Sequence, residues 1–145
     1  MYAILCLAVA LFLAPPAQGD AVKKELEALT GTWEIVYLES DGKEQALEDL
    51  QQIRRIQQGD HIIWKNGDQT IMELRFEIDP KTNPKQVNST YLTGENKGKT
   101  HLGIYRLDGD DFTMCFAAFD KPRPAEFATT PKSGLIVYKA RRVAK

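Results

Sequence analysis

Along most of the chain, apolar and polar residues alternate with a period of two, which is the pattern of β-strands that bury one face and expose the other. The clearest segment is residues 72–78, where Met72, Leu74, Phe76 and Ile78 alternate with charged residues. Similar short segments recur roughly every eight to twelve residues, with turn sequences between them. The sequence therefore predicts about eight or nine short antiparallel strands, arranged as a barrel or a sandwich.

Turn residues mark the ends of the predicted strands. Asp41-Gly42 and Asn66-Gly67 are typical of tight hairpin turns, and Asp108-Gly109-Asp110 joins two apolar segments. The long helices that connect parallel strands are missing from the pattern, which excludes a doubly wound fold. The predicted strands cover residues 33–38, 53–57, 62–64, 72–78, 86–92, 102–107, 112–118, a short piece at Phe127, and 135–140.

Two short helices are predicted outside these strands. Residues 21–29 carry apolar side chains on one helical face, with Asp20 as the N-cap and a glycine just past the end. Residues 46–52 are long enough for two helical turns and lie in the first long connection between strands.

The first residues have the composition of a secretory signal. Residues 4–13 are almost wholly apolar, and Pro15-Pro16 ends this run. About ten apolar residues are too few to span a bilayer, which needs about 20. Small residues at positions 17 and 19 fit a signal peptidase site. The alternative is a buried N-terminal helix, because no basic residue precedes the apolar run.

We therefore expect a signal peptide at residues 1–19 and one β-domain at residues 20–145. The expected location is outside the cytoplasm, either periplasmic or secreted, with no stable membrane insertion after cleavage. Because Asp20 is the first charged residue, the mature chain keeps all 19 basic and 20 acidic residues. This balance gives no case for nucleic-acid binding, which needs a net basic face.

Several segments resemble chemical motifs, but their spacing argues against each. Residues 94–100 have three residues between their glycines where a phosphate-binding loop has four, and a strand follows where a helix is required. The aspartates at 108–111 lack the longer loop that calcium needs. His61 and His101 have no metal-ligand partners at suitable spacing. We therefore predict no metal, no cofactor and no catalytic residues.

Cys115 is the one cysteine of the expected mature chain, so it cannot form an intramolecular disulfide, and we expect it to pack as a small hydrophobe. Lys121-Pro122-Arg123-Pro124 forms a stiff basic loop. We favour a rigid crossover between strands, since proline fixes φ and cannot donate to a strand ladder. The alternative is a contact loop in which Lys121 and Arg123 bind an anion or a partner.

Gly31-Thr32-Trp33 opens the first strand after a short helix. It resembles the G-x-W motif of lipocalins and related calycin barrels. The resemblance implies that Trp33 closes one end of the barrel and that a basic residue near the C-terminus packs over its indole by a cation–π contact. Arg141 or Arg142 is placed for this role, and Arg141 is our choice.

A longer series of motifs closely resembles an uncharacterised, commonly secreted domain family that is abundant in planctomycete bacteria and often regarded as lipocalin-like. The likeness extends over residues 29–138 and implies an all-β, antiparallel, eight-stranded lipocalin-like barrel with a short N-terminal helix. It implies no activity. Its motifs are, in order, Gly31-Thr32-Trp33, Asp41-Gly42-Lys43, Asp79-Pro80, Asn83-Pro84-Lys85, Asn96-Lys97-Gly98-Lys99-Thr100, Leu102-Gly103-Ile104-Tyr105, Leu107-Asp108-Gly109-Asp110, Cys115-Phe116-Ala117, Lys121-Pro122-Arg123-Pro124 and Glu126-Phe127.

An eight-stranded barrel either packs solid or holds one small ligand. Our first hypothesis is a module that binds a small apolar or amphipathic ligand, with residues 46–52 as a lid or plug. The alternative is a structural or protein-interaction domain with a filled barrel, whose protein partner the sequence does not identify. A hydrolase or isomerase in the barrel mouth has only two histidines and scattered carboxylates in its favour. The aromatic residues assigned to the barrel lining are Tyr37, Trp64, Phe76, Tyr105, Phe112 and Phe116.

Overall fold

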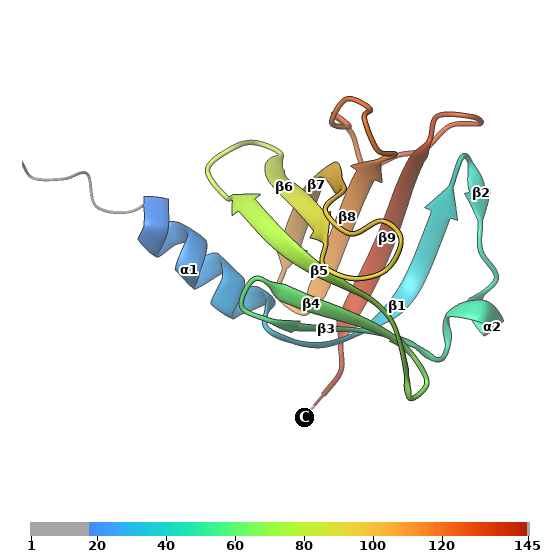
Figure 1. Ribbon diagram of the computed structural model, residues 1–145, viewed down its shortest axis with the longest axis horizontal. Coiled ribbons are helices and arrows are strands. Elements are labelled where there is room, and N and C mark those ends of the chain that lie inside the picture. Colours follow the sequence, from blue (N-terminus) through green and yellow to red (C-terminus); the bar gives the residue numbers. More distant parts are fainter. Residues whose placement is uncertain (1–17, 145) are drawn as a thin grey trace, which may run out of the picture.

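A computed structural model describes residues 18–144 of the chain, and Figure 1 shows the arrangement of its elements. The signal predicted for residues 1–19 lies outside the described residues, except for its last two, which begin the first helix. The elements are α1 (Gln18–Leu29), β1 (Gly31–Ser40), β2 (Lys43–Glu44), α2 (Leu47–Leu50), β3 (Ile53–Gln58), β4 (His61–Asn66), β5 (Gln69–Asp79), β6 (Lys85–Tyr91), β7 (Thr100–Asp108), β8 (Asp111–Ala117) and β9 (Leu135–Arg142).

The strands form one antiparallel sheet that closes on itself. Each strand from β3 to β8 pairs with the next along the chain, β1 pairs with β3, and β9 returns to pair with β1. The two-residue β2 only extends the end of β1 and takes no part in closure. Eight strands therefore form a closed barrel, which confirms the predicted fold class, and Figure 1 shows β9 beside β1 at the seam.

Alternation of side chains separates the interior of the barrel from its surface. On β5, Leu74 and Phe76 are buried, while Arg75 and Glu77 are exposed. The tight turns between strands use residues that tolerate positive φ: Gly59 joins β3 to β4 with φ of 59°, and Gly67 joins β4 to β5 with the same φ. The period-two pattern therefore predicts this wall correctly.

A β-bulge on β1 reverses that alternation. The register against β9 shifts between Ile35 and Tyr37, so Ile35 lies opposite Ala140 and Leu38 lies opposite Tyr138. One extra residue at the bulge changes which face each later side chain occupies. As a result Leu38 faces the interior, and Tyr37 packs on the outside with Ile104, Cys115 and Val137. The prediction that Tyr37 lines the barrel is wrong for this reason.

The helix α1 covers one end of the barrel, which we call the closed end. Leu29, its last residue, is fully buried and belongs to the main core cluster. Glu25 accepts a hydrogen bond from Lys85 Nζ at 2.6 Å and one from the Tyr105 hydroxyl at 3.2 Å. Burial, together with the Glu25 carboxylate, raises the pKa of Tyr105. These contacts fix the helix against β6 and β7.

The opposite end of the barrel, the open end, carries the helix α2 and a long loop. α2 is a single short helix, in place of the two turns predicted for residues 46–52; its Leu50 joins the core and its Leu47 is exposed. No strand forms at Phe127, because residues 118–134 run as a loop. Phe127 instead packs against the outer cluster, and the Arg106 guanidinium lies over its ring. Across the described part of the chain, neither helix has the length and hydrophobicity needed to cross a bilayer.

Candidate ligand-binding site

The interior of the barrel holds a cavity of about 250 Å³. Its wall is mainly apolar and aromatic, and the strands β1, β4, β5, β6, β7, β8 and β9 all contribute to it. None of the lining residues that the structure describes is Asp or Glu. The wall consists of Leu38, Trp64, Met72, Leu74, Phe76, Ser89, Tyr91, His101, Met114, Phe116, Ile136 and Tyr138.

The cavity occupies the half of the barrel nearer the open end. Leu38 and Ile136 lie near the ends of β1 and β9 that point away from α1, and Tyr91 ends β6 on the same side. All three remain partly exposed, whereas the deeper residues Phe76 and Tyr138 are buried. A ligand would therefore enter from the open end.

The aromatic residues predicted to line the barrel fall into three groups. Trp64, Phe76 and Phe116 line the cavity. Tyr105 and Phe112 are buried in the main core, where Phe112 packs against Trp33 with 5.9 Å between ring centroids. They fill the interior near the closed end and do not line the cavity. Tyr37 lies outside the barrel, as described above.

Much of the wall was not predicted. Tyr138 and Ile136 alternate on β9, and Met72 and Leu74 follow the period of β5, so alternation alone could have found them. Leu38 was not predicted, because the bulge moves it to the inner face, where strict alternation would have placed Tyr37. His101 was considered as a metal ligand or catalytic base and not as a lining residue, but its ring stacks on Phe119 with 4.1 Å between centroids and forms part of the wall.

The polar groups in the wall are few. Ser89 is buried, and the Tyr138 hydroxyl donates to Met114 Sδ at 3.3 Å. His101 Nδ1 lies 2.7 Å from the carbonyl oxygen of Ala117, so this nitrogen carries the proton and donates. Burial lowers the pKa of His101 and so favours the neutral ring. The hydrogen bond to the Ala117 carbonyl has the opposite, smaller effect.

Beneath the cavity, toward the closed end, lies Arg55 of β3, a fully buried arginine. Its guanidinium carbon is 5.0 Å from the Phe76 ring centroid and 4.7 Å from that of Phe112. Nη2 donates to Gln57 Oε1, while Nε and Nη1 have no acceptor. The burial of Arg55 was not predicted. Residues 53–58 contain two adjacent arginines and two glutamines, and charged side chains on strands usually face water.

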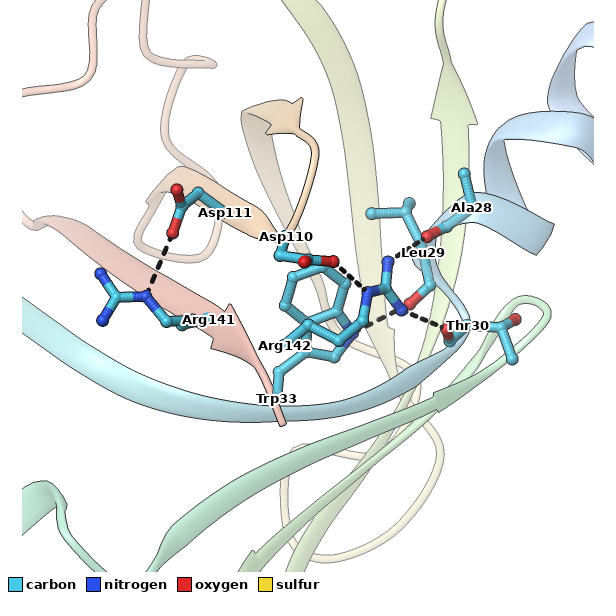
Figure 2. Close-up of polar contacts among 8 residues, drawn as sticks. All are labelled: Ala28, Leu29, Thr30, Trp33, Asp110, Asp111, Arg141 and Arg142. Atoms are coloured by element: carbon cyan, nitrogen blue, oxygen red, sulfur yellow. Dashed lines mark hydrogen bonds and ion pairs between the residues drawn. The ribbon is translucent and has the colours of Figure 1, made fainter. Parts of the chain in front are cut away.

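The closed end is sealed around Trp33, and Figure 2 shows its contacts. The fully buried indole donates from Nε1 to the carbonyl oxygen of Leu29 at 3.0 Å. The guanidinium carbon of Arg142 lies 4.3 Å from the indole centroid. Arg142 also donates to the carbonyl oxygens of Thr30 at 2.7 Å and Ala28 at 2.6 Å, and from Nε to Asp110 Oδ1 at 3.0 Å.

Arg142 therefore holds the place that we had assigned to Arg141. Trp33 lies opposite Arg142 in the pairing of β1 with β9, so these two side chains share a face, whereas Arg141 points outward to Asp111 Oδ1 at 3.5 Å (Figure 2). Gly31 leaves space for this arginine: a Cβ at Gly31 would lie 2.7 Å from Arg142 Nη1. Both fixed positions of the G-x-W motif thus act on Arg142: Gly31 leaves room for its guanidinium, and Trp33 packs against it.

The basic loop is held firmly at Arg123. Its guanidinium donates to the carbonyl oxygens of Val87 at 2.8 Å and Gly103 at 2.7 Å, and to Asn88 Oδ1 at 2.7 Å. These bonds favour the rigid crossover, while Lys121 stays exposed. A role of Lys121 and Arg123 in partner contact remains a prediction. A shallow hollow beside this loop, outside the barrel, is lined by Thr82, Asn83, Pro84, Gln86, Ile104, Arg123, Pro124 and Ala125.

The two histidines do not form a catalytic arrangement in the described residues. His61 Nε2 lies 2.9 Å from Glu73 Oε2, but both side chains sit on the outer surface and are partly exposed. His101 lines the cavity, but no carboxylate lines it with the histidine. Within residues 18–144 no group of three or more Asp, Glu, His or Cys side chains is placed to hold a metal ion.

The fold and this cavity define the protein as a closed, eight-stranded antiparallel barrel with a partly open apolar interior. No protein-family model, no curated protein and no solved structure matches the chain.

Proposed function

We propose that this protein is an extracytoplasmic, lipocalin-like module that binds a small apolar or amphipathic molecule inside its barrel. The observation that carries the proposal is the cavity of about 250 Å³ with its apolar and aromatic wall. Small-molecule sites are typically concave and mostly apolar, with a few polar groups that orient the ligand. Ser89, His101 and Tyr138 are such groups in this wall.

The size of the cavity limits the ligand. A volume of about 250 Å³ equals that of roughly eight water molecules in the liquid, so the buried part of the ligand has roughly eight to ten non-hydrogen atoms. A longer molecule would extend past Leu38, Tyr91 and Ile136 into the open end. Leu47, exposed on α2 at that end, offers further apolar surface.

Titration with a fluorescent fatty acid tests this function, after mild extraction to remove any molecule carried through purification. Native mass spectrometry of the unextracted protein shows whether such a molecule is present. We expect a saturable fluorescence signal with one site per chain. No bound species together with no saturable signal would refute the proposal.

A matched pair of variants locates the site. Leu38→Trp adds a large ring at the cavity wall, whereas Ile71→Trp makes a comparable change at an exposed position of β5 outside the wall. We expect Leu38→Trp to weaken probe binding at least about tenfold and Ile71→Trp to leave it within about twofold. Equal effects would place the probe outside the barrel.

The proposed location rests on the signal-like composition of residues 1–19. Expression of the full chain, followed by cell fractionation and N-terminal sequencing of the product, tests it. We expect a mature N-terminus at Asp20 in the extracytoplasmic fraction. An intact Met1 in a cytoplasmic fraction would contradict this part of the proposal.

The alternative is a structural or protein-interaction domain with a filled barrel; the cavity of about 250 Å³ favours the binding function over it. Contact with a protein partner through the outer surface would not need the cavity.

A further inference from the structure

The interior of the barrel contains polar hydrogen atoms that have no acceptor. Among the described residues, three buried side-chain nitrogen atoms lack any partner: Arg55 Nε, Arg55 Nη1 and Trp64 Nε1. Arg55 and Trp64 face each other across the pairing of β3 with β4, so all three atoms belong to one cross-strand pair. All three are donors, and a buried donor without an acceptor is costly.

The charge of Arg55 is also uncompensated. The buried polar or charged side chains of the described chain are Arg55, Gln57, Ser89 and Thr113, and none is an acid. Gln57 accepts from Nη2 and itself donates to the carbonyl oxygen of Gly59 at 2.8 Å, so it supplies one neutral acceptor. The rings of Phe76 and Phe112 offer only cation–π contacts. A buried cation is normally paired with an anion.

This cation lies next to the cavity. Three lining residues adjoin Arg55. Trp64 is its cross-strand partner, and Phe76 lies under its guanidinium. Tyr138 is the third, because the nearby Arg55 partly offsets the rise that burial causes in the pKa of Tyr138. The Tyr138 hydroxyl donates to Met114 Sδ and lies close enough to Arg55 for the guanidinium to lower the pKa of that hydroxyl, but Arg55 Nε and Nη1 form no hydrogen bond with it. Arg55 is not itself a lining residue; it lies behind the lining residues Phe76 and Tyr138, at the inner end of an apolar cavity that opens in the other direction.

We infer that the ligand is a carboxylate with an apolar tail, whose headgroup pairs with Arg55 and Trp64 while the tail fills the cavity. This inference rests on the proposed function and names the class of its ligand. The carboxylate supplies the missing acceptors and the missing negative charge together. Its binding replaces part of the contact that the Phe76 and Tyr138 rings make at the inner end of the cavity.

Octanoate and 1-octanol are the probes that test the headgroup, because they share a tail of suitable size and differ in charge. Isothermal titration of the extracted protein at neutral pH measures both affinities. We expect octanoate to bind about 10- to 100-fold more tightly than 1-octanol, the range for a hydrogen bond to a charged group. In the Arg55→Met variant we expect octanoate to lose that advantage while 1-octanol binds at least as tightly as before.

Arg75→Met is the matched control, since Arg75 lies on the outer face of β5. This variant should bind both probes like the unaltered protein. The fluorescence of Trp64 provides a second measurement: octanoate should change it at similar concentrations in the unaltered protein and in Arg75→Met, but only at higher concentrations in Arg55→Met. Trp33 is the only other tryptophan in the chain, and it is sealed at the closed end.

The outcomes separate the two proposals. Equal affinity for octanoate and 1-octanol, or octanoate affinity unchanged by Arg55→Met, would overturn the carboxylate inference and leave a binding barrel. Failure of both probes and of the fluorescent fatty acid to bind would overturn the proposed function and this inference with it. Should Arg55→Met fail to fold, Arg55→Lys keeps the charge without the planar fork and should reduce octanoate affinity several-fold.

Discussion

At the closed end of the barrel each of the three guanidinium nitrogens of Arg142 has an acceptor, whereas in the interior the guanidinium of Arg55 has only Gln57. Arg142 retains 27% exposure of its side chain, and Arg55 has none. Both arginines lie against aromatic rings. The more exposed arginine is therefore the better satisfied one, which is the reverse of what burial demands.

This difference separates a structural contact from the proposed binding site. Arg142 ties α1, β1 and the turn between β7 and β8 together through atoms of the chain itself. Arg55 makes its one hydrogen bond within its own strand and otherwise contacts only the rings of Phe76 and Phe112, and the cavity beyond these rings has space for a ligand. Incomplete satisfaction of buried polar groups is a reason to look for a ligand, because native interiors leave few such groups without partners.

The largest effect expected is on Trp33, the centre of the closed end. Trp33→Ala should lower the free energy of unfolding by about 3–5 kcal/mol, because it removes a fully buried indole from a packed site. Trp64→Ala should cost less, since Trp64 borders an existing cavity and its Nε1 has no partner to lose. Urea unfolding of both variants measures the difference. Equal losses would show that the two tryptophans contribute alike to the fold.

Removal of Arg142 should come next in size. Arg142→Ala loses three hydrogen bonds from a charged group and the contact with Trp33, so we expect a loss of about 2–3 kcal/mol in the free energy of unfolding. Arg141→Ala removes only an exposed ion pair at 3.5 Å and should change stability by less than about 0.5 kcal/mol. A similar loss in both variants would contradict the assignment of Arg142 to the indole.

Arg55→Met should have the opposite sign. Replacing a buried, incompletely paired cation by an apolar side chain of similar length often leaves stability unchanged or raises it. Because Gln57 Oε1 loses its donor in the variant, we expect a net gain of only about 1 kcal/mol in the absence of ligand. Thermal unfolding of the extracted protein checks this. A clear loss of stability would show that the contacts with Phe76 and Phe112 outweigh the cost of the buried charge.

The barrel could be predicted from the sequence because most of its strands alternate apolar and polar residues with a period of two. Leu74 and Phe76 on β5 face the interior as a period of two requires, and the glycine turns fall where the strands reverse. The G-x-W sequence identified the closed end, since Gly31 and Trp33 both contact a C-terminal arginine. Whether Arg141 or Arg142 contacts Trp33 depends on the register of β1 against β9, which no local sequence signal reveals.

The cavity was harder to predict, and Tyr37 and Arg55 show why. Tyr37 was misplaced because a bulge adds one residue to β1 and no local sequence signal marks it. Arg55 was missed because a charged residue in a strand is usually exposed, so the pattern favours the outer face. Functional sites often break the patterns that build a fold, such as strand alternation and the exposure of charged residues. These patterns therefore predict the walls around a site better than the unusual residues within it.

The smallest effect expected is a pH dependence that originates at His101. Burial lowers the pKa of His101 in the folded protein, while the unfolded chain has a histidine pKa of about 6.5. As the pH falls from about 7 through this value, the unfolded state takes up a proton before the folded state does, so stability decreases. His101→Gln should remove this part of the slope when urea unfolding is compared across this pH range. An unchanged slope in the variant would show that His101 does not respond to its place in the wall. If the wall does hold a ligand, a bound apolar tail should bury His101 further, and the pH dependence of the complex should then exceed that of the extracted protein.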